Sequence, residues 1–262
     1  MSITIMKFGG TSVAHLDRIK KAAIKVKSKI LKDKKKVIVV VSAMSGVTNN
    51  LVKNFNKISN DINNPEYDII LSTGEQYSSG VMSVVLNKLG IKSRSLLGWQ
   101  IPIITDDKYG KARIKSINSQ QINKLFKSFD ALVVAGFQGL SSEHRVTTLG
   151  RGGSDTTAVA LAVATKSNFC EIFTDVEGIF TSDPRIVSKA KKIKNITYEE
   201  ILEMSSAGSK VLHPRSVELA MKYGIKIHVR SSFSNKNGTM VIKEEKKLEK
   251  EVVTGISASD NE

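Results

Sequence analysis

The chain has 262 residues, of which 40% are hydrophobic and 25% charged, with 18 glycines and 4 prolines. This length and apolar content suit one large α/β domain or two small ones and exclude a chain dominated by disorder. The single cysteine, Cys170, excludes a disulfide within the chain, and we interpret it as a small buried side chain. The sequence has no signal-peptide pattern and no stretch long enough to cross a membrane, so we expect a cytoplasmic protein without a membrane partner.

The formal net charge of +15 raises the question of nucleic-acid binding. The lysines are scattered over expected helix faces, and the aromatic residues, 6% of the chain, are not interleaved with them. No platform for stacking bases is therefore apparent, and we expect no nucleic-acid partner. We interpret the excess positive charge as an aid to attracting an anionic nucleotide.

Apolar runs typical of strands buried on both faces recur along the chain. These runs are Ile3–Phe8, Lys36–Ser42, Ala131–Gly136, Phe169–Thr174 and Ile225–Arg230. Segments with helical spacing alternate with them, at Leu16–Leu31, Gly80–Leu89, Ser119–Phe126, Ser154–Thr165, Tyr198–Met204 and Pro214–Tyr223. The alternation predicts a three-layer α/β/α sandwich with a mostly parallel central sheet. Only Ile101–Ile117, with short alternating runs around Gly110, predicts a local hairpin.

Two glycine-rich stretches, Lys7–Ser12 and Thr148–Asp155, each follow an apolar run and open a helical segment. Free amides at a helix start carry about half a positive charge, and glycine lets a phosphate approach the backbone closely. Each stretch also carries a basic side chain, Lys7 in the first and Arg151 in the second. We therefore predict that the two stretches form two halves of one phosphoryl-transfer site. The alternative for Lys7, a solvated lysine at a strand end, is disfavoured by the glycines that follow it.

Arg151 and Asp155 lie four residues apart across the start of an expected helix and could face one crevice. An arginine suits a carboxylate ligand through its bidentate fork, and Asp155 could orient Lys7 or a substrate amine. A simple surface ion pair between the two is the alternative. Gly152 and Gly153 argue against that alternative, because a stable exposed helix would not contain two adjacent glycines.

Other polar residues allow two interpretations each. Ser42 and Thr48 follow the second expected strand and either line a ligand crevice or cap the next helix. Glu75 precedes an expected helix and either favours the dipole of that helix or meets a ligand ammonium group. The segment Thr174–Arg185 follows a buried strand, contains turn residues and could hold a nucleotide. We interpret His213, which directly precedes a proline, as a helix cap.

Seven segments in order resemble the aspartate kinase branch of the amino acid kinase family. They are KFGGTSV, SAMSGVTN, STGE, TTLGRGGSDTT, FTDVEGIFTSDPR, SKVLHPRSVELAMKYG and VRSSF. The resemblance implies ATP-dependent phosphorylation of the side-chain carboxylate of L-aspartate to 4-phospho-L-aspartate, the entry to lysine, threonine and methionine synthesis. It also implies L-aspartate and ATP as ligands, Mg²⁺ as a cofactor and assembly into a homo-oligomer, a dimer. An attacking carboxylate is ionised at pH 7, so no general base is needed.

The resemblance further implies roles for individual residues. Lys7 would stabilise the transferring phosphoryl group, Asp155 would organise the site around it, and Lys210 would be a further catalytic residue. The residues expected to bind the substrate are Ser42, Thr48 for the accepting carboxylate, Glu75 for the ammonium group, Arg151 for the α-carboxylate, Gly152, Gly153 and Ser154. The residues expected to contact the nucleotide are Lys7, Gly9, Gly10, Ser12, Thr174, Asp175, Phe180, Asp183, Arg185 and Lys210. No dedicated protein ligand for the metal is expected, because Mg²⁺ is held largely by phosphates and water. Phe180 stands where the family often has tyrosine, so ring packing is expected there without a hydroxyl contact.

The last twenty residues change character, since Lys243–Glu251 alternates four lysines with four glutamates and Val252–Ile256 resembles a strand. With the resemblance, this predicts a catalytic domain over 1–245, with aspartate bound by about 1–150 and ATP by about 151–245. Residues 246–262 would form a linker and the start of a regulatory region of ACT domains. We expect the rest of that region, and with it feedback inhibition by lysine or threonine, to be missing.

Several alternatives stay open. Kinases of acetylglutamate, glutamate or uridylate belong to the same superfamily, although the Glu75 and Arg151 pair favours a free α-amino acid. A basic nucleic-acid-binding protein would show steeply salt-dependent retention of DNA or RNA. A catalytically silent fragment would bind ATP without turnover.

Overall fold

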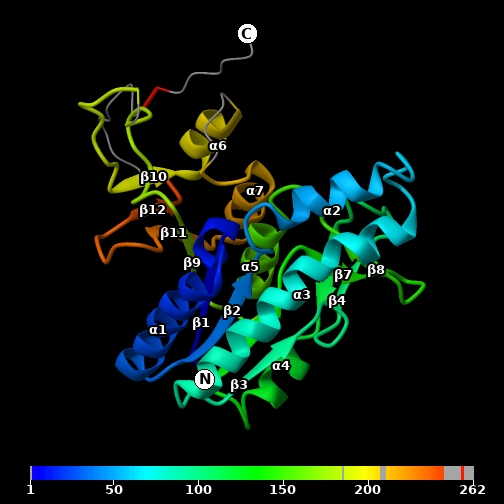
Figure 1. Ribbon diagram of the computed structural model, residues 1–262. Helices are drawn as coiled ribbons and strands as arrows, with labels where there is room; N and C mark the ends of the chain where they lie inside the picture. The colour runs from blue at the N-terminus through cyan, green and yellow to red at the C-terminus, as the bar shows by residue number, and fades with distance from the viewer. Residues whose placement is uncertain (1, 185, 207–210, 245–254, 257–262) are drawn as a thin grey trace.

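The computed structural model describes residues 2–184, 186–206, 211–244 and 255–256. Its framework is an eight-stranded sheet in the order β10-β12-β11-β9-β1-β2-β6-β3 (Figure 1). The strands are β1 (Ile3–Phe8), β2 (Lys36–Val41), β3 (Ser93–Leu96), β6 (Ala131–Ala135), β9 (Phe169–Thr174), β10 (Asn195–Thr197), β11 (Lys226–Ser231) and β12 (Thr239–Ile242). All neighbours pair in parallel except β11 and β12. The central strands are buried along their whole length and mostly apolar, because both of their faces are covered.

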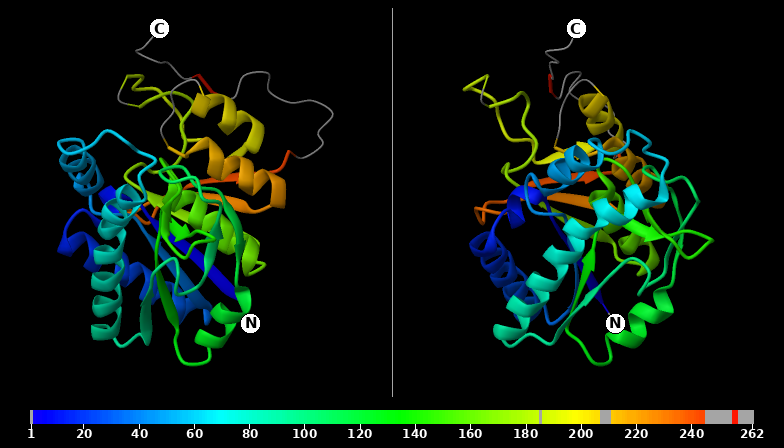
Figure 2. Two further views of the ribbon diagram at one scale, coloured as in Figure 1. Left: turned by 90° about the vertical axis from the view of Figure 1, so that its right-hand side faces the viewer. Right: turned by 45° about the vertical axis from the view of Figure 1, so that its right-hand side comes forward.

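Helices cover the two faces of this sheet (Figure 2). One apolar cluster joins the sheet to α1 and α3, and a second joins it to α4, α5, α6 and α7. The helices are α1 (Leu16–Asp33), α2 (Val47–Phe55), α3 (Pro65–Lys88), α4 (Ser119–Leu125), α5 (Gly153–Ala164), α6 (Tyr198–Ser206) and α7 (Pro214–Tyr223), with a short 3-10 helix η1 (Gly10–Val13). The predicted three-layer α/β/α sandwich is therefore confirmed. No helix in the described ranges is long and apolar enough to cross a membrane.

A second sheet has the order β5-β4-β7-β8 and lies beside α3. Its strands are β4 (Ile103–Thr105), β5 (Ile114–Ile117), β7 (Gln138–Leu140) and β8 (Val146–Thr148). The antiparallel pairing of β4 with β5 confirms the predicted hairpin. Strands β7 and β8 form another hairpin that the sequence did not indicate, because runs of three residues carry almost no periodicity.

Helix α3 differs most from expectation. It begins at Pro65, whereas the sequence predicted a helix only from Gly80. The first part was missed because its buried face is largely polar and shows no apolar period. The members of that face include Ser72, Gly74, Glu75, Ser78 and Ser79. Glu75 consequently lies inside the helix, so the interpretation that it favours the dipole at its own helix start is wrong.

Some expectations fall on residues that the structure does not describe. Lys210 and Arg185 lie outside the described residues, as do 245–254. The strand expected at Val252–Ile256 is described only at Gly255 and Ile256, which are not in a strand. The Ile256 N–H donates to the Thr181 carbonyl at 2.8 Å. Cys170 is fully buried, as expected, and burial raises the pKa of its thiol.

Candidate active site

A cavity of about 350 Å³ lies at the carboxyl ends of β1, β2 and β6. Nine of the residues expected to be catalytic or to bind substrate line it: Lys7, Ser42, Thr48, Glu75, Arg151, Gly152, Gly153, Ser154 and Asp155. These side chains come from four separate segments of the chain. Lys7 and Ser42 meet because the carboxyl ends of neighbouring parallel strands share one edge of a sheet, and α2, α3 and the start of α5 bring the other residues to that edge.

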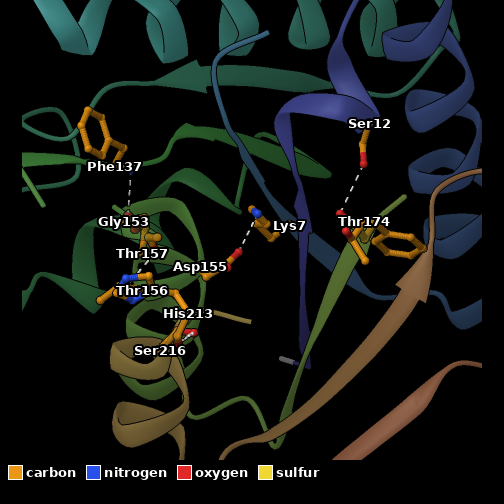
Figure 3. A network of polar contacts seen from close by, with 12 residues as sticks. Lys7, Ser12, Phe137, Gly153, Asp155, Thr156, Thr157, Thr174, His213 and Ser216 are labelled. Carbon is orange, nitrogen blue, oxygen red and sulfur yellow. Dashed lines mark hydrogen bonds and ion pairs between the residues drawn. The ribbon is translucent and has the colours of Figure 1, made fainter. Parts of the chain in front are cut away.

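An ion pair joins the two glycine-rich stretches at this edge. Lys7 is the penultimate residue of β1, and Asp155 lies in the first turn of α5, which covers the face of the sheet toward which Lys7 points. Their Nζ and Oδ1 atoms are 2.5 Å apart, and each side chain is only 11% exposed (Figure 3). Among the described ion pairs Asp155 contacts Lys7 and not Arg151, so the surface-pair alternative is wrong. Since breaking a buried pair leaves an uncompensated charge, the two side chains hold each other in place.

Glu75 offers a second charged group to the cavity. It is 4% exposed, and its Oε1 accepts a hydrogen bond from the Ala43 backbone N–H at 3.0 Å. Its Oε2 is buried and has no hydrogen-bond partner in the described part of the chain. Burial raises the pKa of Glu75 to about 7, with the Ala43 hydrogen bond opposing the shift. A carboxylate held this way is available to a cationic ligand group.

Gly74 explains how Glu75 reaches the loop after β2. A Cβ atom at Gly74 would lie 2.7 Å from the Ala43 Cβ, which is too close for any side chain. The glycine therefore lets α3 approach that loop so that the hydrogen bond from Ala43 to Glu75 can form.

Arg151 is exposed at the mouth of the cavity, between two glycines in the left-handed region. Gly150 has φ +75° and Gly152 has φ +71°. A Cβ atom at Gly152 would lie 2.2 Å from the His213 Cγ, so the imidazole sits directly against this loop. His213 is the N-cap residue of α7 by position, as expected, but its side chain makes no capping hydrogen bond. Burial lowers the pKa of His213.

Ser42 and Thr48 line the cavity from the loop and helix that follow β2. The N-cap residue of α2 is Gly46, with φ +83°, and no side chain caps this helix. The alternative that Ser42 or Thr48 caps the helix is therefore wrong.

The expected nucleotide residues lie around the adjacent strand ends. Gly9 and Gly10 follow β1, and Thr174 and Asp175 lie at the end of the neighbouring β9. The Thr174 Oγ1 donates to the Asp175 Oδ1 at 3.0 Å. Of this group, Lys7 and Gly10 line the cavity.

Ser12, Phe180 and Asp183 do not line the cavity, although Ser12 lies at the same strand ends, beside the end of β9. The Ser12 hydroxyl is buried, where it donates to the Phe173 carbonyl at 3.3 Å and accepts from the Ser232 hydroxyl at 2.5 Å. Phe180 forms an isolated bridge with Lys192, and the Asp183 carbonyl accepts the N–H groups of residues 186 and 187.

Sequence reasoning missed several lining residues, among them Asn49 and Phe137. Phe137 follows β6 and has φ +69°, and its N–H donates to the Thr157 Oγ1 of α5 at 3.1 Å (Figure 3). The signal was present, since β6 was an expected strand and ligands bind beyond the carboxyl ends of parallel strands.

Known proteins share the sequence that builds this site. The sequence model of the amino acid kinase family matches residues 2–231. The aspartokinase of Rickettsia felis is 48% identical over 266 aligned residues, covering 100% of this chain and 66% of that protein. The aspartokinase of Geobacillus stearothermophilus is also 48% identical, covering 99% of this chain and 64% of that protein. The chain thus spans just under two thirds of the length of these relatives.

Solved structures agree. The aspartate kinase from Synechocystis superposes with a TM-score of 0.81 at 44% identity, over 93% of this chain and 40% of that one. The aspartokinase III of E. coli, in complex with aspartate and ADP, gives a TM-score of 0.81 at 29% identity, over 94% of this chain and 65% of that one. The family model matches most of the chain, and the family motifs meet at one edge of the sheet. This chain therefore belongs to the amino acid kinase family.

Proposed function

We propose that the chain transfers the γ-phosphoryl group of ATP to the side-chain carboxylate of L-aspartate, giving 4-phospho-L-aspartate and ADP. The relatives called aspartokinase, and the aspartate and ADP bound by the E. coli protein, support this choice. The observation that carries it is one cavity lined by a buried carboxylate whose Oε2 has no partner among the described residues, an arginine and a lysine–aspartate pair.

The two charged groups of Glu75 and Arg151 suit the two ends of a free α-amino acid. The Glu75 Oε2 would accept the α-ammonium group, and the Arg151 fork would bind the α-carboxylate. Ser42 and Thr48 offer hydroxyl groups to the remaining carboxylate. An acylated amino acid lacks the ammonium group, and a uridine nucleotide lacks both ends, so either would leave Glu75 buried without a partner.

The reaction needs positioning and charge neutralisation. An oxygen of the substrate carboxylate attacks the γ-phosphorus as the bond to the leaving ADP oxygen breaks, and the electron pair of that bond leaves on ADP. The attacking carboxylate is already ionised, so no proton has to be removed. The Lys7 ammonium would stabilise charge on the phosphoryl oxygens, and Asp155 would hold that ammonium in place.

The nucleotide phosphates would lie against the loop after β1, with the residues after β9 beside them. No cluster of three or more metal-ligating side chains exists among the described residues, and the Asp155 carboxylate is already paired with Lys7. This donor set fits Mg²⁺ carried mainly by phosphate oxygens and water. When bound, Mg²⁺ neutralises phosphate charge. A homodimer remains part of the proposal and is tested by the molecular mass in solution.

A substrate panel tests the proposed function. The chain with Mg-ATP is offered L-aspartate, L-glutamate, N-acetyl-L-glutamate or UMP, and ADP release is measured by a coupled assay. We expect kcat/KM for L-aspartate to exceed that for each other acceptor by roughly a hundredfold or more, because only aspartate fits both charged ends at the right length. Preferred turnover of another acceptor would replace the proposed substrate, and ATP binding without any turnover would favour the silent-fragment alternative.

A further inference from the structure

The segment that presents Arg151 is held by a buried carboxylate that the proposed chemistry does not use. Asp68 lies on α3, is fully buried and accepts hydrogen bonds through both oxygens. Its Oδ1 accepts from the Thr148 hydroxyl at 2.7 Å and from the Gly110 N–H at 2.9 Å. Its Oδ2 accepts from the Thr148 N–H at 2.6 Å and from the Gly110 N–H at 3.0 Å. Asp68 therefore joins α3 to the end of β8 and to the turn between β4 and β5.

A half-buried arginine contacts the same two segments. Arg215 lies in the first turn of α7, and its Nη1 donates to the Leu149 carbonyl at 2.6 Å. Its Nη2 donates to the Ala112 carbonyl at 2.7 Å. The Ala112 N–H in turn donates to the Thr148 carbonyl at 2.9 Å. The acceptors of Arg215 and the donors to Asp68 thus lie on the same two short segments, 110–112 and 148–149.

We call the contacts of Asp68 and Arg215 with residues 110–112 and 148–149 the clamp. It ends two residues before Arg151. Gly150 rests on the same turn, since a Cβ atom there would lie 3.1 Å from the Gly110 carbonyl oxygen. Arg151 follows and reaches the cavity mouth. Hydrogen bonds to charged groups are roughly twice as strong as neutral ones, so the backbone before Arg151 is more firmly fixed than an ordinary loop.

We propose that Asp68 and Arg215 are positioning residues that set the affinity for the α-carboxylate of the substrate through Arg151. This inference rests on the proposed function. Asp68 precedes Glu75 by seven residues, which places both on one face of α3, because seven residues are close to two helical turns. One helix thereby carries the acceptor for the ammonium group and fixes the arginine for the carboxylate.

The first variant is Asp68→Asn, which keeps the shape but places an amide N–H₂ against groups that are all donors. We expect the KM for aspartate to rise by roughly tenfold to a hundredfold, while kcat and the KM for ATP stay within about threefold. The reason is that the α-carboxylate of aspartate, which does not react, binds less tightly when Arg151 is displaced. Thr148→Val removes one donor and keeps the carboxylate, and it should raise the KM for aspartate by about threefold. If Asp68→Asn does not fold, Thr148→Val and Arg215→Lys carry the same test.

Two comparisons separate positioning from general support of the fold. The control is Glu66→Gln, since Glu66 also joins α3 to the start of β8, through an ion pair with Arg145 at the surface. We expect its KM for aspartate to be unchanged. The second comparison repeats Asp68→Asn in an Arg151→Ala background, where the KM for aspartate should rise by no more than about twofold further, because the two residues act through one contact. Equal rises in both backgrounds, or no rise in wild-type background, would overturn the inference.

If the proposed function is wrong, the unaltered chain shows no aspartate turnover, so this outcome differs from a failure of the positioning role alone. The local stability of the loop is then measured by amide hydrogen exchange over 148–152. Faster exchange in Asp68→Asn but not in Glu66→Gln supports the clamp, and equal exchange in the two variants overturns it.

Discussion

At the scale of single residues, burial decides which charges matter. Lys7 and Asp155 are nearly enclosed and 2.5 Å apart, whereas the described ion pair of Lys20 with Asp17 lies in solvent. Exposed pairs contribute little, because water screens them and ordering two long side chains costs entropy. The enclosed pair lies where transferred phosphate charge must be stabilised.

Lys7→Ala should therefore lower kcat by roughly a hundredfold or more, because it removes transition-state stabilisation and leaves Asp155 without its partner. The measurement is steady-state turnover at saturating aspartate and ATP, with thermal unfolding as a check that the variant is folded. A folded variant with near-normal kcat would remove Lys7 from the mechanism.

Glu75 gives a prediction about pH. Its pKa is raised from 4.5 to about 7, so between these values the folded state keeps a proton that the unfolded state has lost. The contribution of Glu75 to the free energy of unfolding should thus fall as pH rises through this range. One pKa unit corresponds to about 1.4 kcal/mol, so Glu75→Gln should gain roughly 2–3 kcal/mol of stability relative to wild type between pH 5 and pH 8.

Denaturant unfolding of both proteins at the two pH values measures this difference. Aspartate turnover supplies the other half of the test, since Glu75→Gln should raise the KM for aspartate by losing the carboxylate that binds the ammonium group. A stability difference that does not change with pH would show that the carboxyl group titrates normally.

At the scale of elements, α3 gives up apolar burial to carry function. Its buried face holds Asp68, Glu75, Gly74 and a series of serines, and Gly80 is a second, partly exposed glycine within the helix. The two glycines have different surroundings, because a Cβ atom at Gly74 would clash with Ala43 while one at Gly80 would meet nothing within 4 Å.

This difference makes a matched pair of variants. Gly80→Ala should stabilise the chain by about 0.5–1 kcal/mol, since alanine is the better helix former. Gly74→Ala should destabilise it by about 1–3 kcal/mol through overpacking, and should raise the KM for aspartate by moving Glu75. Denaturant midpoints at constant m-value check both; stabilisation by Gly74→Ala would show that the close approach of α3 is not required.

At the scale of the whole molecule, the strand order creates the site. Strand β1 lies between β2, which follows it across one face, and β9, which is reached through α5 on the other face. Ligand sites in open α/β sheets form where the connections leave in opposite directions. Lys7 from the first part of the chain therefore meets Asp155 from the second. The division of aspartate and ATP binding between about 1–150 and 151–245 stays a prediction.

Much of this architecture could be predicted from local sequence. The bounds of β1 and β9 match expectation, because a short, mostly apolar run suits a strand covered on both faces. The start of α3 was missed although Asn64 caps it and Pro65 stands at its first position, because the serines and glycines on its buried face give no apolar period. The three-residue strands β7 and β8 were missed because they are defined by their pairing.

The amino-acid sequence by itself determined the layered α/β class, the glycine-rich strand ends and the residue types that a phosphoryl-transfer site requires. Only the tertiary structure decided that Asp155 pairs with Lys7, that Glu75 lies inside a helix with one free oxygen, and that Asp68 holds the segment before Arg151. The reason is physical: residue type and local spacing depend on near neighbours, whereas these contacts join segments tens of residues apart and depend on strand order and helix packing.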